Sequence, residues 1–93
     1  MIEIRKAEAE DREAVARLIE QLEEAPMDRE VFNGVYLENL NNPQIVYLTA
    51  LSEGKIRGFV SVHVQKLLHH IAPIAEIQEL VVDEQARGQG LGK

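Results

Sequence analysis

The sequence EIQELVVDEQARGQGLGK, from Glu76 to Lys93, joins an apolar run to a glycine-rich segment. The apolar run ends in Leu-Val-Val, which is typical of a largely buried strand. Polar residues then interrupt it, and three glycines follow at every second position, Gly88, Gly90 and Gly92. We therefore predict a strand over residues 76–82 that leads into a loop of unusual backbone freedom.

The glycine-rich loop has the properties of an anion site. Glycine adopts positive φ readily and lets a ligand come close to the backbone. Several peptide N–H groups can then point to one place, together with the first amides of any helix that begins after the loop. Arg87 and Lys93 add positive charges on either side. The natural ligand is a phosphate or pyrophosphate.

Two common phosphate loops do not fit this sequence. A Walker loop needs a glycine where Arg87 stands and a hydroxyl residue after the lysine. The dinucleotide fingerprint needs Gly-x-Gly-x-x-Gly, whereas the spacing here is Gly-x-Gly-x-Gly. Both classes of nucleotide site are therefore excluded.

The whole chain sets limits on the class of protein. Its 93 residues allow at most one domain, and the absence of cysteine excludes disulfides and thiolate chemistry. No apolar run approaches the length of a membrane span, and the N-terminus lacks the apolar core of a signal peptide. The net charge of −6 disfavours binding to nucleic acid. We expect a cytoplasmic protein with neither a membrane nor a nucleic-acid partner.

The remaining chain predicts two helices and three further strands. Residues 2–6 alternate as a short strand, residues 10–24 carry apolar side chains at helical spacing, and Asp28 can cap a second helix that ends near residues 41–43. Residues 45–51 and 56–65 form a hairpin around Ser52-Glu53-Gly54-Lys55, with Gly58 marking a bulge or a close backbone approach. Residues 66–73 are a loop or a ragged strand end. The order is β-α-α-β-β-β and then the anion loop.

The loop and this order together resemble the GNAT superfamily of N-acetyltransferases. Its acetyl-CoA loop, Arg/Gln-x-x-Gly-x-Gly/Ala after an apolar strand, is matched by the segment 87–92 and also from Gln85. Within the superfamily, the string HVQKLLHHIAPIAEIQELVV, from His63 to Val82, is most similar to aminoalkylphosphonate N-acetyltransferases. The resemblance implies an α+β fold with a mostly antiparallel sheet and two helices. It also implies acetyl transfer to a small primary amine such as an aminoalkylphosphonate.

The resemblance assigns acetyl-CoA, the co-substrate, to the end of the chain. The backbone N–H of Leu80 resembles the donor to the thioester carbonyl, and Val82 would pair with the pantetheine amides. Their side chains are expected in the core. The pyrophosphate and the adjacent parts of the donor would be contacted by residues on either side of the strand end, namely Val81, Gln85, Arg87, Gly88, Gln89, Gly90, Leu91, Gly92 and Lys93.

Two glutamates compete for the role of catalytic base. Glu79 lies beside the expected acetyl site and resembles the acidic residue that many relatives use, whereas some relatives place the carboxylate three residues earlier, at Glu76. In a regular strand the two side chains point to opposite faces, so only one should reach the cleft unless a bulge intervenes. Either residue could also be an ordinary solvated side chain.

The histidines allow two interpretations. His63, His69 and His70, with Lys66, would line the acceptor site and bind an anionic group such as a phosphonate. They could instead hold a divalent metal with Glu79, although their spacing matches no standard metal motif. The alternative is that they are ordinary strand and loop residues.

A complete GNAT domain continues beyond this loop through further helices and strands, and the tyrosine that often protonates the thiolate lies there. Tyr36 and Tyr47 fall on the wrong elements to replace it. We therefore expect residues 1–93 to be one incomplete domain. The alternative function is a catalytically incomplete fragment that binds CoA weakly or only self-associates through its open strand edge. Its expected protein partners are a second copy, as a homodimer, or the missing half of the domain.

Overall fold

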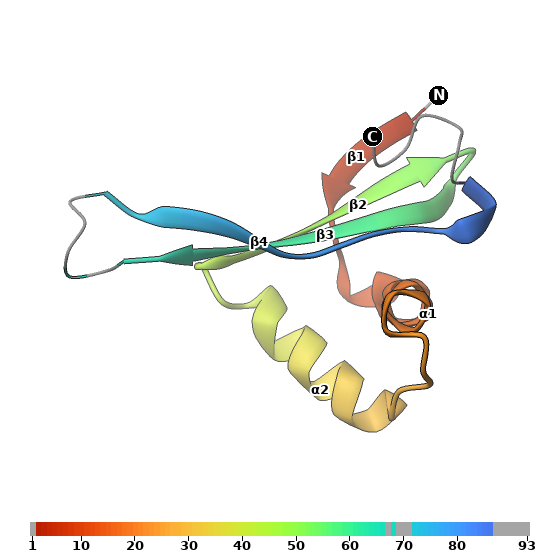
Figure 1. The fold of residues 1–93 in the computed structure, drawn as a ribbon, viewed down its shortest axis with the longest axis horizontal. Helices are drawn as coiled ribbons and strands as arrows, with labels where there is room; N and C mark the ends of the chain where they lie inside the picture. Colours follow the sequence, from red (N-terminus) through yellow and green to blue (C-terminus); the bar gives the residue numbers. More distant parts are fainter. Residues whose placement is uncertain (1, 67, 69–71, 87–93) are drawn as a thin grey trace.

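The computed structural model describes residues 2–66, 68 and 72–86. Two helices and four strands follow the predicted β-α-α-β-β-β order (Figure 1), which confirms the expected α+β fold class. The elements are β1 (Ile2–Lys6), the 3-10 turn η1 (Ala9–Asp11), α1 (Arg12–Glu23), α2 (Arg29–Leu40), β2 (Ile45–Ser52), β3 (Lys55–Gln65), β4 (Ile74–Val82) and the 3-10 turn η2 (Glu84–Ala86).

The connection between the two helices is defined by local chemistry. α1 ends where Glu24 takes the left-handed conformation, with φ of 57°, and Pro26 follows, which cannot continue a helix. Asp28 then caps α2, because its carboxylate accepts a hydrogen bond of 3.1 Å from the Val31 amide. The capping role predicted for Asp28 is confirmed.

β2 and β3 form the predicted hairpin around a two-residue turn. Glu53 and Gly54 have φ of 54° and 79°, the backbone of a type I′ turn, which follows the natural twist of paired strands. Further along, the register skips Arg57. The extra residue is a β-bulge directly beside Gly58, where the sequence predicted an irregularity.

The sheet is covered by helices on one face. Its strand order is β1-β2-β3-β4 with every pair antiparallel. Both helices lie on the same side of it (Figure 1), α1 against β3 and β4 and α2 against β2. The core fills the space between these layers. It contains Val15, Leu18, Tyr36, Phe59 and Val81.

The opposite face of the sheet is aliphatic, and its large side chains are exposed. Ile4 is 61% exposed, Ile77 63% and Leu80 55%. The sequence predicted a largely buried β4 with Leu80 in the core, and this is wrong for Leu80. Only Val81 of the Leu-Val-Val run is fully buried, at 3% exposure, because it alone faces the helices.

None of the helices in the described part of the chain is long and apolar enough to span a membrane.

Candidate functional site

Glu79 and Glu76 lie on the same face of β4, the face that the helices cover. The register places Glu79 opposite Ser61 and Glu76 opposite His63. Ser61 and His63 are two residues apart on β3 and therefore share a face. The register skips Gln78, which adds one residue between the glutamates. Opposite directions were expected only for a regular strand, and the bulge, which was the stated exception, turns both side chains to one face.

Only one of the two glutamates is bound to the interior of the protein. The Oγ of Ser61, which is fully buried, donates a hydrogen bond to Oε1 of Glu79. Glu76 is exposed, and within the described residues its carboxylate makes no hydrogen bond or ion pair. Glu79 is therefore fixed towards the helices, while Glu76 faces solvent.

A pocket of about 430 Å³ lies between the two helices and the sheet, and Glu79 lines it. This volume is in the range of small-molecule sites, which combine apolar walls with a few polar groups. The wall fits that description, because nine of its thirteen residues are Val, Ile, Met, Phe or Tyr. The lining consists of Val15, Ile19, Met27, Asp28, Val31, Phe32, Val35, Tyr36, Asn39, Tyr47, Phe59, His63 and Glu79.

Tyr47 is part of the wall of this pocket. The side-chain amide of Asn39 donates to Oη of Tyr47 at 2.8 Å. Burial raises the pKa of Tyr47, and the charge of Glu79 raises it further, against the lowering effect of the Asn39 bond. The phenol is therefore protonated at neutral pH. Since its hydrogen goes to no acceptor among the described residues, it can donate to a molecule in the pocket.

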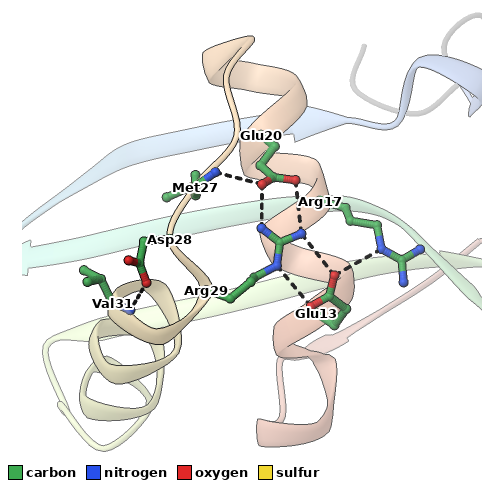
Figure 2. Close-up of polar contacts among 7 residues, drawn as sticks. All are labelled: Glu13, Arg17, Glu20, Met27, Asp28, Arg29 and Val31. Carbon is green, nitrogen blue, oxygen red and sulfur yellow. Dashed lines mark hydrogen bonds and ion pairs between the residues drawn. The ribbon is translucent and has the colours of Figure 1, made fainter.

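Met27, which lines the pocket, lies in the segment between the helices, and Glu20 and Arg29 connect this segment to α1 (Figure 2). The guanidinium of Arg29 reaches back to α1, where it lies 2.5 Å from the carboxylate of Glu20 and 3.0 Å from that of Glu13. Glu20 also accepts a hydrogen bond of 2.8 Å from the Met27 amide. Arg29 and this amide lower the pKa of Glu20 from 4.5 to about 2. The short segment between the helices is thus tied to α1 by charge-assisted bonds.

Comparison with known proteins agrees with this fold. The sequence model of the acetyltransferase (GNAT) family matches residues 3–93. The chain belongs to the GNAT acetyltransferase family. It is 41% identical over 90 residues to the aminoalkylphosphonate N-acetyltransferase of Salmonella typhimurium, and the match covers 97% of this chain and 58% of that relative.

Solved GNAT structures have the same architecture. Glucosamine-6-phosphate N-acetyltransferase from Arabidopsis thaliana superposes with a TM-score of 0.78 at 29% identity, over 99% of this chain and 67% of that one. A GNAT acetyltransferase from Staphylococcus aureus has a TM-score of 0.85 at 20% identity, over 98% of this chain and 69% of that one. The second likeness concerns the fold alone. The chain therefore spans between about three fifths and two thirds of the proteins it matches.

The segment assigned to acetyl-CoA is described only in part. Leu80 is exposed, Val82 is half-buried, and β4 has β3 on one side with no described strand on the other. Gln85 is exposed in η2, and its amide donates to Oδ1 of Asp83 at 2.8 Å. Asp83 also donates its own amide to the carbonyl of Arg57 at 2.7 Å. The segment from Arg87 to Lys93 lies outside the described residues.

The residues assigned to the acceptor are only partly brought together. His63 is half-buried and lines the pocket with Glu79. Lys66 is exposed just after β3 and is not part of the pocket wall, while His69 and His70 lie outside the described residues. Within residues 2–66, 68 and 72–86, no three His, Asp or Glu side chains gather as metal ligands would.

Sequence reasoning did not find Ser61, Asn39 or the place of Tyr47 in the pocket wall. Ser61 alternates with Phe59 and His63 on β3, so its inward direction follows from the strand assignment alone. The contact of Asn39 with Tyr47 depends on how α2 packs against β2. No local pattern carries that information.

Proposed function

We propose that this chain supplies the acceptor site of an N-acetyltransferase that moves an acetyl group from acetyl-CoA to a small primary amine. The observation that carries the proposal is the position of Glu79 in a pocket of small-molecule size with a mostly apolar wall. A carboxylate there attracts an ammonium group and can also accept its proton. Membership of the acetyltransferase family supplies the reaction class.

Proton removal is the step that this site has to perform. An amine is protonated at neutral pH, and its nitrogen can attack only after losing a proton. Acetyl-CoA supplies an acyl carbon activated as a thioester, so that the new C–N bond forms as the C–S bond breaks and the thiolate leaves. Glu79 takes the amine proton, directly or through a water. Tyr47 can donate a hydrogen bond to a polar group of the same acceptor.

The donor is proposed to lie along β4 and the loop after it. The Leu80 amide would donate to the thioester carbonyl, with Val81 and Val82 beside the pantetheine arm. Gln85 lines a second hollow, of about 560 Å³, together with four cations, Arg5, Arg17, Lys55 and Arg57. Three of these cations are in ion pairs, Arg5 with Asp11, Arg17 with Glu13 and Arg57 with Asp83. The segment 87–93 is proposed to bind the pyrophosphate.

The first acceptors to test follow from the Salmonella relative, which acts on aminoalkylphosphonates by its name. His63 is the one basic side chain in the described wall of the pocket. We propose that it contacts the phosphonate, together with Lys66, His69 and His70. Each aminoalkylphosphonate should therefore be compared with an unsubstituted alkylamine of the same length.

The decisive experiment compares two isosteric variants, Glu79→Gln and Glu76→Gln. Acetyl-CoA-dependent thiol release with the amines above is measured together with calorimetric binding of acetyl-CoA. Loss of a general base typically lowers the rate by about 10²–10⁴-fold, and this is expected for Glu79→Gln with donor binding retained. Glu76→Gln should remain close to the parent protein.

Three outcomes would contradict parts of this proposal. A large loss only in Glu76→Gln would assign the base to the exposed carboxylate. Equal activity of both variants and the parent would remove both carboxylates from the mechanism. Acetyl-CoA binding without turnover of any amine would mean that the chain binds the donor and does not catalyse the transfer.

A further inference from the structure

Ser61 is a fully buried polar residue at the centre of the sheet. It has 0% exposure and lies on β3 between Tyr47 of β2 and Glu79 of β4, both directly opposite it in register. A buried hydroxyl without a hydrogen-bond partner is costly. The partner that Ser61 has is the Glu79 carboxylate.

Glu79 needs such a partner in order to hold one position. β4 is the last strand of the described sheet, and a half-exposed glutamate on it has three side-chain torsions that would otherwise be free. The hydroxyl of Ser61 binds Oε1. The other oxygen, Oε2, makes no hydrogen bond to any residue that the structure describes and is available to a molecule in the pocket.

We propose that Ser61 is a positioning residue for acetyl transfer, which fixes the Glu79 carboxylate so that its second oxygen meets the acceptor ammonium. This inference rests on the proposed role of Glu79 as base. It assigns to Ser61 no contact with the substrate, because Ser61 lies beneath the pocket wall and is not part of the lining.

A neighbouring residue shows what a purely structural hydroxyl looks like in the same sheet. Thr49 of β2 is also buried, at 1% exposure, and its Oγ1 donates to the backbone carbonyl of Arg5 at 3.3 Å. It does not line the pocket. Thr49→Val therefore removes a buried hydroxyl of the same kind without touching Glu79, and it is the matched control.

The first test is Ser61→Ala, assayed by steady-state acetyl transfer. A reacting group displaced by about 1 Å can cost up to about a hundredfold in rate, so kcat is expected to fall about tenfold to a hundredfold. The KM for acetyl-CoA should not change, because the donor does not meet Ser61. Ser61→Thr keeps the hydroxyl and should recover most of the lost kcat. Thr49→Val should keep the kcat of the parent.

The second test combines Ser61→Ala with Glu79→Gln in a double-mutant cycle. If Ser61 acts through Glu79, Ser61→Ala has no further effect on kcat once the base is removed. The inference would be overturned if the kcat of the double variant fell by the product of the two single-variant losses. It would also be overturned if Ser61→Ala lowered kcat no more than Thr49→Val does. The cycle stays informative even if Ser61→Thr fails to fold. Unchanged activity of Glu79→Gln alone would instead overturn the proposed base.

Discussion

Glycine has opposite effects at two positions of this chain. Gly54 has φ of +79° in the β2–β3 turn, a conformation that costs a residue with a Cβ about 1–2 kcal/mol. Gly34 lies within α2, where glycine is about 1 kcal/mol less favourable than alanine. A Cβ at either position would meet no atom within 4 Å. Backbone conformation alone therefore decides whether a substitution at these positions raises or lowers the stability of the fold.

We predict that Gly34→Ala stabilises the fold by about 1 kcal/mol and that Gly54→Ala destabilises it by about 1 kcal/mol. Urea unfolding of both variants and the parent measures the two changes. The pair is its own control, because the chemical change is identical. Shifts of the same sign would show that packing, and not φ, dominates at one of the sites.

At the scale of single residues, side-chain alternation predicts which residues of β3 share a face but not the geometry of β4. The inward positions of β3 could be read from the sequence, and His63, which was proposed for the acceptor site, lines the pocket. That Glu79 and Glu76 lie on the same face could not be read from the sequence, because it depends on the bulge at Gln78. The bulge in β4 has no glycine beside it that could have indicated it from the sequence, whereas the bulge in β3 lies beside Gly58.

Among the elements, the junction between α1 and α2 depends on pH. Arg29 lowers the pKa of Glu20 to about 2 and also lowers that of Glu13. A carboxylate with a lowered pKa in the folded state contributes stability above its unfolded pKa, near 4.5, and loses it as the pH falls through the folded pKa. The contribution of this junction should therefore disappear between about pH 4.5 and 2.

We predict that Arg29→Met is less stable than the parent at pH 7 and that the difference shrinks as the pH falls through this window. Urea unfolding at a series of pH values between 7 and 2 measures it. Arg17→Met is the control, because Arg17 is an exposed side chain that pairs only with Glu13. A difference that stays constant from pH 7 to 2 would mean that Arg29 acts through packing.

The helices and the hairpin could be predicted because their signals are local. Capping by Asp28, the Glu53-Gly54 turn and the apolar spacing of α1 each lie within a few residues. The start of β4 was placed two residues too late, at residue 76 instead of Ile74. Strand ends are set by the partner strand, here β3, and the local sequence does not contain that information.

For the whole molecule, the central feature is a core on one side of the sheet only. Val81 and Leu80 are neighbours on β4, yet Val81 is 3% exposed and Leu80 is 55% exposed. Truncating a buried aliphatic side chain removes packing and leaves a cavity, whereas a half-exposed one loses little. Truncation of Val81 should therefore lower the free energy of unfolding more than truncation of Leu80, although valine is the smaller residue.

We predict that Val81→Ala destabilises the fold by about 2 kcal/mol and that Leu80→Ala costs less than about 1 kcal/mol. Unfolding in urea, repeated at several protein concentrations, measures both values. If Leu80→Ala costs as much as Val81→Ala, the aliphatic face is covered in solution. A dependence of that cost on protein concentration would identify the cover as a second copy.

The candidate site as a whole shows which features a sequence can reveal. The family resemblance correctly indicated the fold and the family, and it proposed Glu79, which the structure places in a pocket. The pocket wall itself joins α1, α2 and three strands across more than sixty residues, from Val15 to Glu79. Its shape and the Asn39–Tyr47 contact arise only when these elements pack together.

The bulge at Gln78 also bears on how related proteins diverge. Since it brings positions 76 and 79 to the same side of the strand, an acidic residue at either one approaches the helix-covered side, displaced from the other by roughly 7 Å. A carboxylate at either position therefore turns to the same side while the strand keeps its path. If two homologues carried the carboxylate at these two different positions, an alignment that treats the strand as regular would count the carboxylate as lost from one of them.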